Sequence, residues 1–121
     1  MNEKSKIIIT NNPKVQESFV GKKELELIFV EERKKVFTKA RDLIHQNWQL
    51  INHTMMANIP LHMHPYRSLA LKKGTELDMQ SLSLIEGAIE RLGRGKLPKY
   101  NQRNLDDFQE LDLVLFNEVK I

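Results

Sequence analysis

The 121 residues include no cysteine. A disulfide framework, a thiolate zinc site, an iron–sulfur cluster and a thiol nucleophile are therefore excluded. The chain also lacks an apolar run long enough for a signal peptide or a membrane span, because Ile7-Ile8-Ile9 is followed at once by polar Thr10-Asn11-Asn12. We expect a cytoplasmic protein that is not attached to a membrane, and no feature of the sequence calls for a cofactor.

Charge of one sign is not in large excess either. Nineteen Lys and Arg residues against sixteen Asp and Glu residues give a formal net charge of +3. A charge this small is compatible with anionic ligands but does not identify nucleic acid as a partner. Hydrophobic residues make up 40% and charged residues 29%, which is typical of a globular protein, and the length fits one domain over residues 1–121.

Hydrophobic patterns predict an alternation of strands and helices. The isoleucine run at 7–9 is β-branched and apolar on both faces, as in a strand covered on both sides. We predict strands at 6–10, 25–30, 49–53 and 66–72, and helices at 14–19, 31–48, 78–92 and from Asn104 onward. This order predicts a small three-layer α/β sandwich with about four mostly parallel strands.

Three local predictions follow from the same patterns. The strand–helix–strand run over 25–53 predicts a βαβ unit with a parallel pair. Asp78 and Asn104 are the expected N-caps of the last two helices. The run 111–116 fits both a helical and an alternating pattern, so a terminal strand stays open beside the favoured helix.

The first candidate site is Thr10-Asn11-Asn12, between a strand end and a helix that Pro13 can begin. Free backbone N–H groups and the helix dipole would favour an anion there. The competing interpretation is that Asn12 is only an N-cap. A Walker-type phosphate loop is excluded, because neither a glycine-rich loop nor its lysine is present.

The second candidate site contains histidines. His62 and His64 are two residues apart and would face the same way on an extended segment, as a metal site needs. His53 ends a predicted strand, which is a rigid mount for a ligand-contacting residue or a general base. Against a metal, no Asp or Glu lies between Asp42 and Glu76. Solvated loop histidines are the alternative.

Tyr66 and Arg67 complete the set of ligand-binding candidates with Thr10, Asn11, Asn12 and His53. Ligands of open α/β sheets bind where strands end and helices begin. We therefore expect residues 10–12, His53 and Arg67 to meet at one edge of the sheet. The basic stretch from Arg91 to Arg103 fits a solvated helix end better than a nucleic-acid site.

The opening segment Ile8-Ile9-Thr10-Asn11-Asn12-Pro13-Lys14-Val15 resembles the start of the GrdX family. The similarity continues, in the same order and spacing, through the segments 41–45, 50–53, 65–68, 84–90 and 107–113. This family is the small protein X encoded beside the selenoprotein glycine reductase components of amino-acid-fermenting anaerobes. The resemblance implies an accessory protein of unestablished biochemistry, and the lack of cysteine agrees with a role away from the redox step.

Several functions remain open at this point. The favoured one is an accessory protein that binds a small anionic ligand or a protein partner, and a homodimer is compatible with a domain of this size. The alternative is a small hydrolase or transferase that uses His53, assisted by a metal at His62 and His64. A fainter likeness of residues 10–17 to the start of house-cleaning nucleotide pyrophosphatases lacks evident carboxylates for magnesium.

Overall fold

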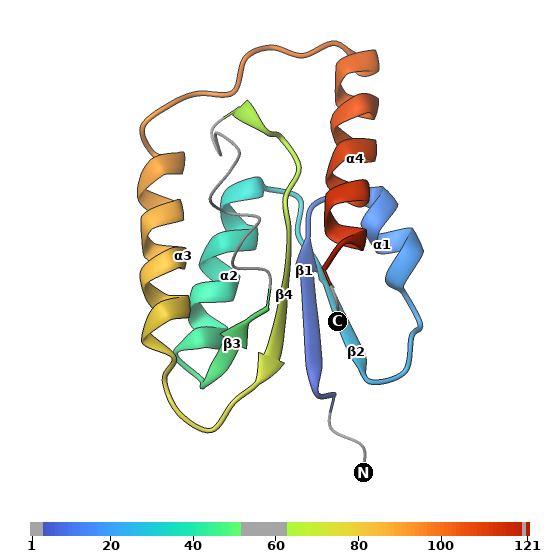
Figure 1. Cartoon of the computed structure of the whole chain (residues 1–121). Helices are drawn as coiled ribbons and strands as arrows, with labels where there is room; N and C mark the ends of the chain where they lie inside the picture. The colour runs from blue at the N-terminus through green and yellow to red at the C-terminus, as the bar shows by residue number, and fades with distance from the viewer. Residues whose placement is uncertain (1–3, 52–62, 120) are drawn as a thin grey trace.

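A computed structural model of the chain describes residues 4–51, 63–119 and 121 (Figure 1). Strands and helices alternate over most of its length, as predicted. The elements in chain order are β1 (Lys6–Thr10), α1 (Pro13–Phe19), β2 (Leu25–Phe29), α2 (Arg33–Ile44), β3 (Trp48–Leu50), β4 (Ser68–Lys73), α3 (Met79–Leu92) and α4 (Gln102–Asn117).

The four strands form one mixed sheet in the order β2-β1-β4-β3. β1 pairs in parallel with β2, from Lys6 opposite Leu25 to Thr10 opposite Phe29. β4 is antiparallel to both of its neighbours, β1 and β3. The prediction of mostly parallel strands is therefore wrong. The first four residues of β4 are buried, as in a central parallel strand that helices cover on both faces. Here the strand that the helices cover is antiparallel, so burial did not indicate its direction.

The βαβ unit predicted over 25–53 is also wrong in its pairing. β2 and β3 lie at opposite edges of the sheet, with β1 and β4 between them. The neighbouring parallel pair is instead β1 and β2, which α1 connects. The error arose because α1, with seven residues, is a weaker pattern in the sequence than α2.

Helices cover both faces of the sheet, which gives the three layers that the sequence predicted. α2 and α3 lie on one face, and α1 and α4 on the other (Figure 1). Because side chains alternate along a strand, Ile7 and Ile9 pack against α2 and α3, whereas Ile8 packs with Val15 of α1 and Phe116 of α4. All five side chains are buried.

α2 begins at Arg33, two residues later than predicted, and two other helix ends differ from the predictions by about one turn. α2 ends at Ile44 and not at Trp48, because Asn47 adopts a left-handed conformation with φ of 74° that turns the chain into β3. α4 begins one turn early, since the side chain of Asn101 accepts the N–H of Asn104 at 2.8 Å and is the N-cap.

Other helix predictions are confirmed. Asp78 caps α3 by accepting the N–H of Ser81 at 3.1 Å. α4 continues to Asn117, so residues 111–116 are helical and the alternative of a terminal strand is wrong. Across the described ranges, no helix combines the length and apolar character that crossing a bilayer requires.

Two glycines provide a matched test of this packing. A Cβ at Gly74 would lie 2.6 Å from the backbone oxygen of Asn47, whereas a Cβ at Gly87 in α3 meets nothing within 4 Å. Gly74→Ala should lower the free energy of unfolding by about 1–3 kcal/mol through this overlap. Gly87→Ala should raise it by about 0.5–1 kcal/mol, because glycine is unfavourable inside a helix. Urea unfolding measures both, and a Gly74→Ala protein as stable as the wild type would contradict the close approach of Gly74, after β4, to Asn47, before β3.

Candidate functional site

The candidate site lies at the edge of the sheet where β1 and β2 end and β4 begins. α2 starts at this edge, and the connector from α3 to α4 passes above it (Figure 1). Thr10, Asn11 and Asn12 follow β1, and Tyr66 and Arg67 precede β4. Since Thr10 pairs with Ser68, the two segments lie side by side.

A chain of buried hydrogen bonds joins this edge to α4. We call it the Asp112 network and define it as Thr10, Asn12, Ser68 and Asp112. Asp112 Oδ2 accepts Ser68 Oγ at 2.7 Å and Asn12 Nδ2 at 3.0 Å. The Ser68 hydroxyl donates its one proton to Asp112, so the hydroxyl of Thr10 is the donor in the 2.7 Å bond between Thr10 and Ser68. The Thr10 hydroxyl oxygen in turn accepts the Asn12 N–H at 2.9 Å. None of the four residues is more than 5% exposed.

Asn11 fixes the segment before β4. Its Nδ2 donates to the Pro65 carbonyl at 2.9 Å, and its Oδ1 accepts the Arg67 N–H at 2.8 Å. Both bonds use the side chain as a backbone mimic that pairs with the neighbouring chain. Asn11 therefore sets where Tyr66 and Arg67 leave the sheet.

Asn12 has two further contacts outside the network. Its Oδ1 accepts the Lys14 N–H at 3.0 Å, so Asn12 is the N-cap of α1, and its Nδ2 also donates to the Gln109 carbonyl at 2.9 Å. One side chain thus connects α1 to α4. The anion-binding site predicted at residues 10–12 stays a prediction. In the structure, the side chains of these residues make hydrogen bonds that hold the strands and helices together.

The electrostatics of Asp112 follow from its position. Burial raises the pKa of this carboxyl above its ordinary value of 3.8. The hydrogen bonds from Asn12 and Ser68 and the positive charge of Arg67 act in the opposite direction. Asp112 is the one carboxylate among the buried polar residues of the described chain, so Arg67 and Asp112 are the opposite charges inside this edge.

Positive charge gathers around Arg67. We define the arginine cluster as Arg33 at the start of α2, Arg67 before β4 and Arg91 in the last turn of α3. Burial lowers the pKa of Arg67; Asp112 opposes this, while Arg33 and Arg91 lower it further. Arg67 is 3% exposed. Arg33 and Arg91 thus act on Arg67 from two separate elements.

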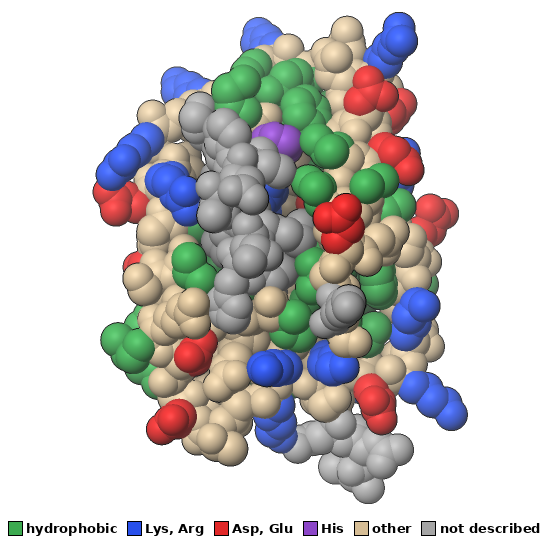
Figure 2. All heavy atoms as spheres, in the orientation of Figure 1, with side chains coloured by type: hydrophobic (Ala, Val, Ile, Leu, Met, Phe, Trp, Pro, Cys, Tyr) green, Lys and Arg blue, Asp and Glu red, His purple; other side chains and the backbone are tan. Residues whose placement is uncertain are grey.

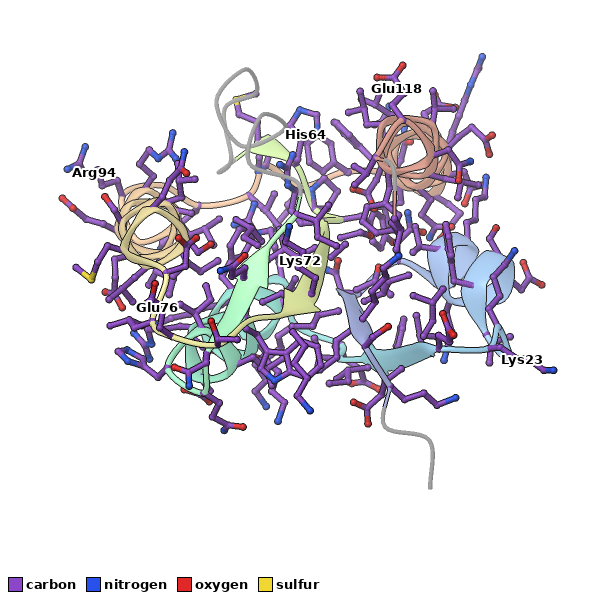
Figure 3. All side chains as sticks on the ribbon, turned by 60° about the horizontal axis from the view of Figure 1, so that its bottom comes forward. Lys23, His64, Lys72, Glu76, Arg94 and Glu118 are labelled. Atoms are coloured by element: carbon purple, nitrogen blue, oxygen red, sulfur yellow. The ribbon has the colours of Figure 1, made fainter. Side chains whose placement is uncertain are left out.

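His64 lies within the same field. The Arg33 guanidinium donates from Nη1 to the His64 carbonyl at 2.8 Å. Partial burial lowers the pKa of the His64 imidazole, and the charges of Arg67 and Arg33 lower it further. His64 stands where the chain enters β4 (Figure 3). A lowered pKa keeps this imidazole neutral at physiological pH.

Aromatic side chains border the arginine cluster. The Phe108 ring contacts His64 edge to face with centroids 5.2 Å apart and lies 4.8 Å from the Tyr100 ring. Tyr100 donates its hydroxyl to the Met63 carbonyl at 2.8 Å. Hydrophobic side chains gather around a histidine on this part of the surface (Figure 2). The edge therefore combines one buried cation, Arg67, with an apolar border.

The structure brings five of the predicted site residues together: Thr10, Asn11, Asn12, Tyr66 and Arg67. The Tyr66 hydroxyl accepts Gln109 Nε2 of α4 at 3.0 Å, which adds another link to that helix. His53 and His62 lie outside the described residues, so their predicted roles stay predictions. Within ranges 4–51, 63–119 and 121, no group of three His, Cys, Asp or Glu side chains could hold a metal.

Sequence reasoning missed Asp112, Ser68 and Arg33. Asp112 could have been found, because it stands four residues from both Phe108 and Phe116 on the inner stripe of α4. An acidic residue in an apolar stripe signals a buried partner. Arg33 gave no such signal, since a basic residue in the first turn of a helix is ordinarily solvated.

Replacing Asp112 by asparagine should remove a specific pH dependence. Because the folded-state pKa of Asp112 is raised, the folded chain holds this proton more tightly than the unfolded chain does. The contribution of the group to stability is greatest below 3.8 and is lost as the pH rises through the raised pKa. The unfolding free energy of the wild type minus that of Asp112→Asn should fall over this window in urea titrations. A difference that rises or stays level with pH would contradict the assignment.

Comparison with known protein families gives a match over almost the whole chain. The family model described as GrdX-like protein matches residues 7–120, from β1 to the residues after α4. The match spans every element of the candidate site. No curated protein and no solved structure matched the chain. The chain belongs to the GrdX-like protein family.

Proposed function

We propose that this protein is a non-catalytic, cytoplasmic accessory protein of glycine reduction that binds a small carboxylate or phosphate anion at the arginine cluster. The proposal is carried by the buried Arg67, on which the charges of Arg33 and Arg91 act from two other elements, together with the Arg33 hydrogen bond to the His64 carbonyl on the segment that leads to Arg67. The link to glycine reduction is part of the proposal and rests on what the resemblance to the GrdX family implies.

The residue type supports an anion in particular. A guanidinium stays charged when it is buried and presents a planar fork of donors that matches carboxylate and phosphate oxygens. Burial strengthens such a contact, because the surrounding dielectric constant is lower than that of water. Arg67 is at the same time the most buried of these cations and the one the other two influence.

The location supports the same ligand. β1 and β2 both end at this edge, where α/β folds bind ligands. α2 begins here, and the positive end of its dipole points at the edge. Its N-cap, Glu32, makes no side-chain capping hydrogen bond. The dipole of α2 therefore adds to the positive charge of Arg33.

A catalytic role would rest on other residues. The hydrolase or transferase alternative uses His53, assisted by a metal at His62 and His64; His53 and His62 lie outside the described residues. The proposed function is therefore binding alone.

The test uses inorganic phosphate, acetate and glycine as probes in isothermal titration calorimetry. The wild type should bind one of them saturably. Arg33→Gln and Arg91→Gln should each weaken binding about tenfold, because a hydrogen bond to a charged group contributes ~1.5 kcal/mol and each 1.4 kcal/mol is a factor of about ten. Bound anion should also raise the pKa of the His64 imidazole, since it offsets Arg67 and Arg33.

The matched control is Lys39→Gln on the exposed surface of α2, which removes the same charge elsewhere. It should leave binding unchanged. Absence of saturable binding for all three probes would refute the proposal. So would equal losses in Lys39→Gln and Arg33→Gln, because the effect would then be one of net charge.

A further inference from the structure

β2 is the terminal strand of the sheet, and one of its edges faces away from β1. The bonds that bracket its ladder run from Lys6 N–H to the Glu24 carbonyl and from Val30 N–H to the Thr10 carbonyl. Backbone direction alternates along a strand, so the even-numbered residues of β2 face β1. Leu25, Leu27 and Phe29 therefore direct their backbone groups outward.

This edge has few of the features that keep strands from pairing. Natural edge strands are blunted by proline, lysine, bulges or a covering segment. Within Leu25–Phe29 there is neither proline nor lysine, and Glu26 is the single charge. The register with β1 runs without a bulge from one end of β2 to the other. Such an edge is suited to receive another strand.

Charges of opposite sign flank the strand. Lys22 and Lys23 precede it, Glu31 and Glu32 follow it, and all four side chains are exposed. Lys23 stands at the outer end of the strand and points away from the domain (Figure 3). A partner that runs antiparallel to β2 should therefore be acidic where β2 begins and basic where it ends. The chain itself has this pattern.

We propose that β2 pairs antiparallel with β2 of a second copy of this chain, about a two-fold axis at Leu27. In this register Leu25 lies opposite the partner's Phe29, and Leu27 lies opposite the partner's Leu27. The turn that carries Lys22 and Lys23 then lies near the partner's Glu31 and Glu32, so charges of opposite sign meet at both ends of the strand pair. The interface is isologous, so each contact occurs twice and no edge is left open to further copies.

The backbone and the apolar side chains agree with this register. The outward-facing residues pair only with one another, as hydrogen-bonded antiparallel pairs require. The N–H of Leu25 bonds to the Lys22 carbonyl at 3.4 Å, which leaves the Leu25 carbonyl to accept from the partner's Phe29. Phe29, which is 37% exposed, would be covered by the partner's Leu25.

Neighbouring registers fit less well. A shift by two residues in one direction places Glu24 opposite the partner's Glu32, a pair of like charges. The opposite shift places Lys23 beside the partner's Phe29 and leaves the glutamates without lysines. A shift by one residue sets inward-facing backbone groups against outward-facing ones. Charge and backbone direction thus select the same register.

Sedimentation velocity over a range of concentrations tests the proposal. The wild type should form a dimer. The double variants K22E/K23E and E31K/E32K should each raise the dissociation constant about a hundredfold or more, because they set like charges against each other. The variant that carries all four changes should dimerise like the wild type. Lys39→Glu on α2 is the control for net charge and should have no effect.

Hydrogen exchange locates the interface independently of charge. The amides of Leu27 and Phe29 should be protected in the dimer and exposed in the double variants, while those of β1 stay protected in both. A wild type that is monomeric at every concentration would overturn the proposal. So would a dimer that ignores the charge reversals, or one in which the Leu27 amide exchanges freely.

Discussion

The carboxylate of Asp112 accepts hydrogen bonds from a serine of β4 and from the asparagine that begins α1, although its own backbone belongs to α4. Three elements that are far apart in the sequence therefore meet at one oxygen atom. Burying a carboxylate costs free energy unless its hydrogen bonds are satisfied. Only one position of α4 on the sheet satisfies these bonds, so they fix the register of the helix. The apolar contacts of Phe116 and Ile8 supply stabilisation on the same face, but they do not select a register by themselves.

The position of the arginine cluster depends on this placement of α4 on the sheet. Arg67 lies one residue before Ser68, and Asn11 holds the same segment by two hydrogen bonds. Fixing Ser68 to Asp112 thus fixes the backbone from which Arg67 extends, and it places a carboxylate near that cation. The fold and the proposed anion site share this edge, while the β2 edge proposed for dimerisation lies on the far side of β1. Arg67 and Arg91 belong to other elements than β2, whereas Arg33 directly follows Glu31 and Glu32, which the dimer would place near the partner's lysines.

Much of this architecture could be read from the sequence, and the failures have physical causes. The run Ile7-Ile8-Ile9 predicts a strand covered on both faces. The apolar stripe of α2, at helical spacing, predicts that helix. Strand direction could not be read, because apolar runs report burial and carry no sign of orientation, so β4 was placed parallel. At the site, Thr10, Asn11, Asn12 and Arg67 were identified from their place at strand ends. The place of Asp112 in the apolar stripe of α4 indicates burial, but its partner Asn12 could not be read, because the two residues are 100 positions apart in the sequence.

A double-mutant cycle on Asn12→Ala and Asp112→Ala tests the central role of this carboxylate most directly. The two residues share a hydrogen bond of 3.0 Å across the α4 interface. If the bond holds α4 on the sheet, the two losses in unfolding free energy should be coupled by about 1 kcal/mol or more. Asn12→Ala combined with Asp78→Ala, at the distant N-cap of α3, should be additive. Additivity of the Asn12 and Asp112 losses to within about 0.5 kcal/mol would contradict the account.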